Sequence, residues 1–251
     1  MLRAITRAVS PSMDACELTF LRREPIDITR ARQQHQAYEE CLRELGVDVI
    51  SLPAEADFPD AVFVEDAAIV LDEVAVMTRL GAESRRGEST SLAAALEPCR
   101  TLRWMADPAT MDGGDVMVAG KTLYIGVTAR SNAAGIAQLA SVVEPFGYHV
   151  HPVAVHGCLH LKSACSYIGD ALMVHRPWVD VSAFAGLRLV DAPEESGANV
   201  LDVGGTVLVT LTAPQTAELL SKMGRQVKML DNSELMKAEG ALTCCSLVFR
   251  A

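Results

Sequence analysis

The sequence predicts an α/β fold in which small sheets close into a ring around one axis. Short β-rich runs come in pairs joined by tight turns, and each pair is typical of a hairpin. Early pairs recur at a regular spacing, and a helix or an irregular stretch follows most of them. A unit repeated about five times, each with a hairpin, a helix and another strand, favours circular closure.

The alternative architecture is an ordinary doubly wound α/β sheet. Successive parallel strands need long crossover connections, whereas these runs follow each other directly. The hairpins therefore argue against the open sheet.

The clearest helix is expected over residues 27 to 46, where apolar side chains recur at helical spacing. Asp27 is placed to cap its start and Gly46 to end it. Two further helices are expected, each ended by a glycine: residues 131 to 146 before Gly147 and residues 213 to 223 before Gly224.

Four hairpins are expected between and after these helices, and the chain ends in one more strand-like run. The hairpins are AAIVLDEVAVM from Ala67, DVMVAGKTLYIGV from Asp115, CSYIGDALMV from Cys165 and NVLDVGGTVLVT from Asn199; the final run is CCSLVF.

Composition limits the classes of partner. The 251 residues include 22 basic and 32 acidic ones, which gives a formal charge of −10. No linker divides the chain, so we expect a single domain over residues 1 to 251. An acidic surface disfavours nucleic acid and anionic membranes and suits a cationic ligand.

The seven cysteines are odd in number and follow no disulfide framework, which is typical of a reducing compartment. The first residues lack an apolar stretch of signal-peptide length, and charge interrupts every later apolar run. We therefore expect a cytoplasmic protein.

Polar side chains that could carry chemistry precede or begin the first strand of successive units. Circular closure would bring these positions together near the axis; in an open sheet they are carboxylates at turns, where Asp is common. They are Asp60, Glu65, Asp66, Asp112, Asp115, His160 and Cys244.

Cys244 is a candidate nucleophile at the entrance of the final strand, where Cys245 would point to the opposite face. The opposing interpretation is an inert core thiol, since cysteine is often buried and reactivity needs a partner. His160 is the best partner, because imidazole can give and take a proton near neutral pH. Asp112, in MDGGDVMV, could orient His160, or it could belong to a tight turn.

A metal site is the rival interpretation of the histidines. His149, His151, His156, Cys158 and His160 lie within a dozen positions. Their spacing matches no standard zinc pattern, so we expect no functional metal. The adjacent Glu65 and Asp66 could likewise bind a cation or be an edge-strand charge pair.

Five motifs in order extend over nearly the whole chain: DAVFVEDAAIV, MTRLGAESRRGE, MDGGDVMVAGKTLYIGVTARSN, CLHLKSACS and ALTCCSLVF. Together they closely resemble dimethylarginine dimethylaminohydrolases of the guanidine-modifying, or pentein, superfamily. The resemblance implies a five-bladed α/β propeller of ββαβ units around a pseudo-five-fold axis. It also implies hydrolysis of asymmetric dimethylarginine or monomethylarginine to citrulline plus a methylamine, without metal or cofactor.

The resemblance further implies a role for each matching residue. The nucleophile falls on Cys244, the general acid and base on His160, and the carboxylate that orients it on Asp112. The substrate contacts fall on Leu18 (through its backbone), Asp60, Glu65, Asp66, Arg85 and Arg130. These types suit the substrate, since carboxylates hold a guanidinium and arginines hold an α-carboxylate.

One position departs from the pattern: Glu239 stands where many family members have Asp. The longer carboxylate could reshape the pocket, so a related small guanidino compound is a second candidate substrate. A deiminase of the same superfamily, a non-catalytic arginine-binding relative and a zinc-binding protein are also compatible with the sequence. A homodimer is expected only because dimers are the commonest assembly.

Overall fold

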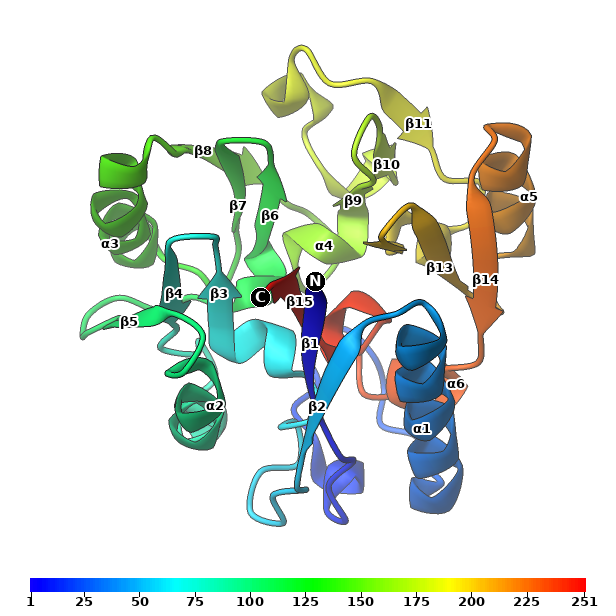
Figure 1. The fold of residues 1–251 in the computed structure, drawn as a ribbon, viewed down its shortest axis with the longest axis horizontal. Helices are drawn as coiled ribbons and strands as arrows, with labels where there is room; N and C mark the ends of the chain where they lie inside the picture. The colour runs from blue at the N-terminus through cyan, green and yellow to red at the C-terminus, as the bar shows by residue number, and fades with distance from the viewer.

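The computed structural model describes all 251 residues and contains five three-stranded sheets arranged around a central axis (Figure 1). The ring confirms the predicted five-bladed α/β propeller. In chain order the first four sheets contain β3 (Ala68–Val70), β4 (Val74–Met77) and β5 (Thr101–Trp104); β6 (Val116–Ala119), β7 (Thr122–Val127) and β8 (His149–Ala154); β9 (Cys165–Tyr167), β10 (Leu172–Val174) and β11 (Leu189–Asp191); and β12 (Leu201–Val203), β13 (Thr206–Thr210) and β14 (Gln226–Leu230).

Each of these four sheets repeats one pattern of pairing. The first strand pairs antiparallel with the second, and the third returns parallel to the second. All four predicted hairpins are confirmed. The second strand lies in the centre of its sheet, which is why sequences such as VAVM and TVLVT are buried at every position.

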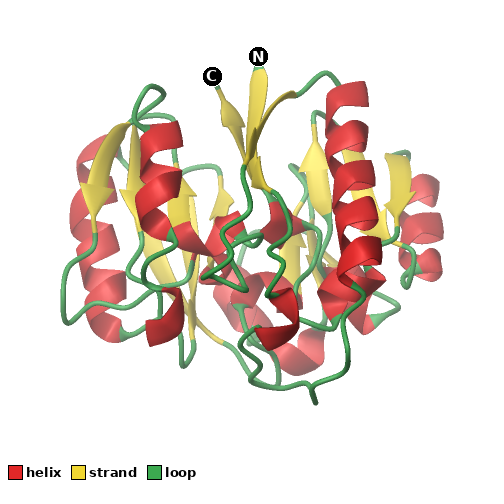
Figure 2. Ribbon diagram, turned by 90° about the horizontal axis from the view of Figure 1, so that it is seen from below, coloured by secondary structure: helices red, strands yellow, loops and turns green.

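The fifth sheet joins the two ends of the chain. It contains β15 (Leu247–Arg250), β1 (Leu2–Arg7) and β2 (Asp48–Leu52), with β15 antiparallel and β2 parallel to β1. The termini therefore lie side by side on one face of the ring (Figure 2). The sequence analysis expected a last strand but did not predict that β1 pairs with it.

Helices cover the outside of the ring (Figure 1). The predicted helices are confirmed as α1 (Ile28–Glu44), α3 (Ala133–Val143) and α5 (Pro214–Lys222), and α2 (Ser89–Leu96) and α6 (Ser233–Met236) are additional. Asp27 accepts a hydrogen bond from the Arg30 N–H, and Gly46 has φ +80°, as expected for the start and end of α1.

The third blade in chain order departs from the ββαβ pattern. Between β10 and β11 it has the 3-10 turns η6 (Arg176–Trp178) and η7 (Val181–Phe184) in place of a helix. Pro177 at the start of η6 removes one backbone donor there. Three other 3-10 turns are η1 (Met13–Ala15), η3 (Glu83–Arg85) and η5 (Glu144–Phe146).

A one-turn helix precedes the first strand of every blade, on the inner side of the ring. These are η2 (Val64–Ala67), η4 (Gly113–Asp115), α4 (Leu161–Ala164), η8 (Glu195–Ala198) and η9 (Thr243–Cys245). Neighbours contact each other: η2 touches η4 and η9, and α4 touches η4 and η8. The candidate residues were expected just before or at the first strand of successive units, and Glu65, Asp66, Asp112, Asp115, His160 and Cys244 lie on or next to these turns.

Five separate apolar cores lie around the ring. The largest packs α1, through Ala31, Tyr38 and Leu42, against the first and last segments of the chain. None of the helices has both the length and the apolar character needed to span a membrane.

Candidate active site

A small pocket lies where the inner turns of several blades meet. Its free volume is about 10 Å³. Seven of the nine predicted site residues lie in or beside it. It is lined by Glu17, Asp60, Phe63, Asp66, Arg85, Arg130, Leu159, His160, Ala238, Glu239, Gly240 and Cys244.

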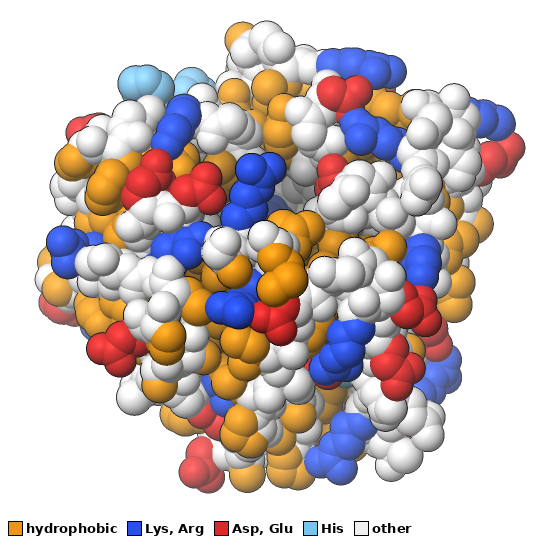
Figure 3. Space-filling view, viewed as in Figure 1, with side chains coloured by type: hydrophobic (Ala, Val, Ile, Leu, Met, Phe, Trp, Pro, Cys, Tyr) orange, Lys and Arg blue, Asp and Glu red, His pale blue; other side chains and the backbone are white.

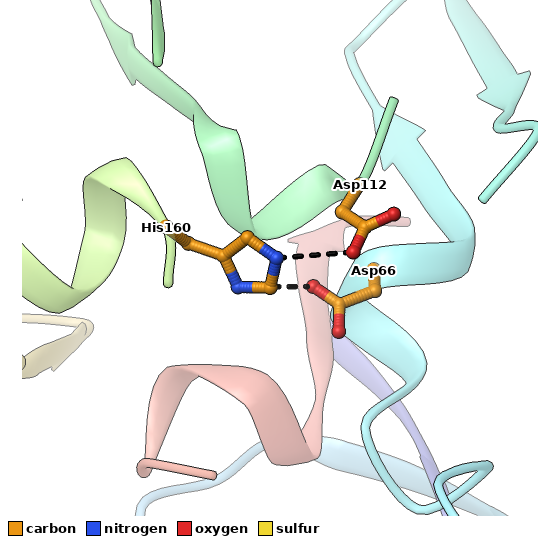
Figure 4. A group of neighbouring side chains, drawn as sticks. All are labelled: Asp66, Asp112 and His160. Atoms are coloured by element: carbon orange, nitrogen blue, oxygen red, sulfur yellow. Dashed lines mark hydrogen bonds and ion pairs between the residues drawn. The ribbon is translucent and has the colours of Figure 1, made fainter. Parts of the chain in front are cut away.

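His160 lies in the pocket wall, and the carboxylates of Asp112 and Asp66 lie next to each other on one side of its ring (Figure 4). Its Nε2 is 3.0 Å from Asp112 Oδ2, and its Nδ1 is 3.9 Å from Asp66 Oδ1. The Gly81 N–H donates to Asp112 Oδ1 at 2.9 Å, which fixes the carboxylate. The structure therefore places Asp112 where the sequence analysis expected the residue that orients His160.

The surrounding charges favour the imidazolium. Burial lowers the pKa of His160, but the carboxylates of Asp66, Asp112 and Asp115 outweigh it and raise the pKa to about 9. Burial raises the pKa of Asp66, but the charges of His160 and Arg85 outweigh burial and hold the pKa of that carboxyl below its usual value. At neutral pH the pocket thus contains a protonated histidine next to the ionised Asp66 carboxylate.

This shift predicts a pH dependence of stability. The pKa of His160 is about 9 in the folded protein and about 6.5 in an unfolded chain, so its stabilising effect is complete below pH 6.5 and disappears as the pH rises through 9. We expect wild type to lose about 3 kcal/mol relative to His160→Gln between these limits. Urea unfolding of both proteins at pH 6 and pH 9.5 measures this difference, and a pH-independent difference would contradict it.

Gly113 and Gly114 allow two inner turns to approach each other. A Cβ at Gly113 would lie 2.0 Å from the Glu65 carbonyl oxygen. A Cβ at Gly114 would lie 2.6 Å from His160 Nδ1 and 2.7 Å from Asp66 Oδ1, and the Gly114 N–H donates to that oxygen at 3.0 Å. The two glycines of the GGD sequence therefore allow the backbone to lie in close contact with the side chains of the site.

We expect Gly114→Ala to disable the site without unfolding the ring. The added methyl displaces His160 or Asp66, and a shift of about 1 Å costs about 10²-fold in kcat. Steady-state turnover measures the effect. The control is Gly46→Ala, which has open space but a left-handed backbone and should lower the melting temperature without changing kcat. Equal kcat in the two variants would contradict this account.

Cys244 is a partly exposed residue on η9, and it lines the pocket. The Ala241 N–H donates to Cys244 Sγ at 3.4 Å. Burial, together with the Glu65 and Asp66 carboxylates, raises the pKa of the thiol to about 12. The thiol is therefore neutral at neutral pH.

The separation of Cys244 from Cys245 has a different cause from the one expected. The sequence analysis assigned the two side chains to opposite faces of a strand, but the pair lies in the 3-10 turn before β15. Successive side chains of such a turn point about a third of a turn apart. Cys245 is buried in the apolar core beside α1, so only Cys244 reaches the pocket.

A buried ion network surrounds Arg85. Its Nη1 donates to Asp66 Oδ2 at 2.9 Å, and its Nε and Nη2 donate to the two oxygens of Glu88 at 2.9 and 3.0 Å. The guanidinium is therefore fixed by two carboxylates. Asp60 lies nearby and accepts a hydrogen bond from the Glu17 N–H at 3.0 Å.

Arg130 has one unpaired hydrogen-bond donor. Its Nη2 donates to Thr19 Oγ1 at 3.1 Å, whereas its buried Nη1 has no hydrogen-bond partner and lies 3.9 Å from Asp112 Oδ2. An unpaired buried donor is costly, so this atom suits an anionic group of a ligand.

Glu65 and Leu18 do not line the pocket. Glu65 Oε1 accepts from Lys162 Nζ at 2.7 Å, and Oε2 accepts from Thr243 Oγ1 at 2.9 Å. These three residues line a second cavity, which also borders the terminal residues Met1, Leu2 and Arg250. Acidic and basic side chains are interspersed on the face of the molecule that has the termini (Figure 3). Leu18 packs on the largest core beside the pocket. Contacts of either residue with a substrate stay predictions.

Asp66, Asp112 and His160 could also hold a metal ion, since their ligand atoms lie within 4.8 Å of one another. Both carboxylates already accept hydrogen bonds from backbone N–H groups, and Arg85 occupies the second oxygen of Asp66. A divalent ion would compete with this cation. His149, His151 and His156 join no such group.

Several residues of the site were not predicted from the sequence. Asp115 was a candidate, but it is buried outside the pocket and accepts hydrogen bonds from Thr128, Ser131 and the Leu161 N–H. Glu88, Lys162 and Glu17 were not identified. The i, i+3 spacing of Arg85 and Glu88 was the one available signal for the first of them.

The ring of five sheets and the pocket define a class of protein. Among solved structures, dimethylarginine dimethylaminohydrolase from Pseudomonas aeruginosa in complex with citrulline matches with a TM-score of 0.94 and 32% identity, covering 99% of this chain and 100% of that one. The N-terminal domain of ArgZ, a cyanobacterial arginine dihydrolase, matches with a TM-score of 0.83 over 99% and 98%. Its identity of 20% shows the fold alone. The chain thus has the guanidine-modifying, or pentein, fold.

The family follows from the sequence relatives. A profile described as N,N dimethylarginine dimethylhydrolase, eukaryotic, matches residues 8–234. The Streptomyces coelicolor N(G),N(G)-dimethylarginine dimethylaminohydrolase is 41% identical over 99% of this chain and 97% of its own length. The Pseudomonas aeruginosa enzyme of the same name is 35% identical over 89% and 90%. The chain belongs to the dimethylarginine dimethylaminohydrolase family.

Proposed function

We propose that this protein hydrolyses Nω-methylated arginines to citrulline and dimethylamine or methylamine. The observation that carries the proposal is the pocket itself: it places the Cys244 thiol, the His160 imidazolium and the Asp66 carboxylate together in a buried site. Such a site provides a nucleophile, a proton donor and an anion for a planar cation.

Substrate binding uses the charges that flank the nucleophile. Asp66 accepts hydrogen bonds from the guanidinium, and the free Nη1 of Arg130 donates to the α-carboxylate at the other end. Asp60 accepts from the α-amino group. Arg85 is paired with Asp66 and Glu88, so its contact with the α-carboxylate requires that one of these ion pairs breaks when substrate binds. A bound cation also offsets the carboxylates that raise the thiol pKa, so Cys244 loses its proton more readily once substrate is present.

The reaction then has two steps. The Cys244 thiolate forms a bond to the guanidino carbon, the bond from that carbon to the methylated nitrogen breaks, and His160 protonates the departing amine. This leaves a covalent thiouronium. In the second step His160 takes a proton from water, the hydroxide adds to the same carbon, and the carbon–sulfur bond breaks to release the thiolate. The added hydroxyl group loses its proton to the released amine, which gives citrulline and a methylammonium ion. Asp112 holds His160 in orientation throughout.

Release of the ureido product tests the substrate, and this product is citrulline for arginine and its methylated forms and N-carbamoylputrescine for agmatine. We expect turnover with asymmetric dimethylarginine and monomethylarginine, at an unchanged rate in the presence of a chelator, because no step uses a metal. Arginine and agmatine are the comparison substrates. Turnover of only one of these would assign a different guanidino compound, and chelator-sensitive activity restored by zinc would overturn the thiol mechanism.

We also propose that residues 1 to 251 act as one catalytic domain in the cytoplasm, as a homodimer that binds no nucleic acid and no membrane. The formal charge of −10 supports the absence of polyanionic partners. Light scattering tests the assembly state, and a monomeric mass would contradict the dimer.

A further inference from the structure

We propose that Glu239 is a positioning residue that holds the segment 17–21 closed over the pocket and thereby controls entry of the substrate. This inference concerns the site of the proposed function, and its kinetic part rests on that function. Three observations support it: the hydrogen bonds of the Glu239 carboxylate, the backbone conformation of Glu239 and the small volume of the pocket.

The Glu239 carboxylate accepts hydrogen bonds from three successive backbone N–H groups. The Thr19 N–H lies 3.1 Å from both oxygens, and the Phe20 and Leu21 N–H groups lie 2.5 and 2.6 Å from Oε1. This stretch has no helix or strand, and these N–H groups have no backbone partner. One distant side chain therefore supplies the acceptors for the whole tip of the segment.

The backbone of Glu239 is held in an unfavourable conformation that directs this contact. Its φ of +58° makes it the only residue other than glycine in the left-handed region. It follows α6, at a place where a chain usually has glycine, and the Gly240 N–H closes the turn on the Leu235 carbonyl oxygen at 3.1 Å. Strain of this kind at a pocket wall indicates a side chain kept for its function.

The segment has to move during each turnover. The pocket has a free volume of about 10 Å³, enough for about one water molecule, whereas an arginine derivative is many times larger. Glu17 and Glu239 both line this pocket, and Thr19 receives the Arg130 Nη2 hydrogen bond. In this proposal, substrate enters when the segment opens and the bonds to Glu239 break.

Glu239→Gly removes the carboxylate without adding strain, since glycine favours a positive φ. Glu239→Gln keeps the length and one acceptor oxygen but loses the charge. The matched control is Glu24→Gln, which changes an exposed carboxylate that follows the same segment and has no hydrogen bond or ion pair.

Amide hydrogen exchange, followed by NMR on the full chain, measures the hydrogen bonds between Glu239 and the segment directly. In Glu239→Gly we expect protection of the Thr19, Phe20 and Leu21 amides to fall at least about tenfold, with Glu239→Gln between that variant and wild type. The Arg30 amide, which donates to Asp27 at the start of α1 and lies outside the segment, serves as an internal reference and should change by less than about twofold. Glu24→Gln should behave as wild type.

Steady-state kinetics provides the second measurement. We expect Glu239→Gly to raise KM for asymmetric dimethylarginine at least about tenfold and to leave kcat within about threefold of wild type. Unchanged protection at the three amides, an equal loss at Arg30, or a fall in kcat with KM unchanged would each overturn the proposal. If wild type does not turn over this substrate, the proposed function fails, and the exchange measurement still decides the role of Glu239.

Discussion

Cys244→Ser is expected to lose at least about 10⁴-fold in kcat, because a serine hydroxyl in the same place is a far weaker nucleophile toward a guanidinium. Cys244 Sγ accepts from the Ala241 N–H, and a serine oxygen can keep that contact. The variant should therefore fold as wild type does and still bind substrate. Turnover and substrate binding, measured on the same sample, separate these effects.

The adjacent cysteine provides the matched control. Cys245 donates to the Ala241 carbonyl oxygen from within the apolar core, and a serine hydroxyl can make the same bond. Cys245→Ser should retain turnover within a few fold of wild type and lose about 1 kcal/mol or more of stability from burial of a hydroxyl. Similar, near-complete activity in both variants would show that Cys244 is not the nucleophile.

Asp112→Asn is expected to cost about 10³- to 10⁴-fold in kcat, although the side chain keeps its shape. The Gly81 N–H requires an acceptor at Oδ1, so the new amide group would face His160 and donate to Nε2. The ring would then bear its proton on the wrong nitrogen and lose the support for its positive charge. The measurement is kcat across pH, with KM recorded alongside.

Two outcomes distinguish orientation of the ring from a general loss of charge. Asp191→Asn removes an exposed carboxylate paired with Arg176 and should leave kcat unchanged. If Asp112→Asn keeps kcat within about tenfold of wild type, orientation by Asp66 alone is sufficient and the role assigned to Asp112 is wrong.

Local features of the fold could be predicted from the sequence. Asp27 caps α1 through an N–H three residues away, and the glycines at 46, 147 and 224 have the left-handed backbone that ends each helix. Hairpins such as β6 and β7 depend on one tight turn. In each case the interacting groups are neighbours in the chain, so the pattern of residue types contains the information.

Long-range contacts could not be predicted in this way. The pairing of β1 with β15 joins the two ends of the chain, and no local pattern specifies it. The hydrogen bonds of Glu239 to residues about 220 positions earlier are of the same kind. The sequence analysis noted Glu239 as a departure from the family pattern, but its contact with the segment 17–21 required the structure.

The candidate site shows the same limit. The motifs identified Cys244, His160 and Asp112, which the structure brings to one pocket or beside it. They did not distinguish Asp66, which faces the pocket, from Glu65, which pairs with Lys162 in the other cavity. Adjacent residues on a 3-10 turn diverge, and the direction of each depends on how η2 packs against η4 and η9.

The most direct test of the central claim is mass spectrometry of the protein after a rapid acid quench during turnover of asymmetric dimethylarginine. The proposed mechanism predicts an adduct equal to the substrate minus dimethylamine, located on the peptide that contains Cys244 and absent from Cys244→Ser. Citrulline formation by the wild-type protein with no adduct, or with an adduct on another residue, would contradict covalent catalysis by Cys244.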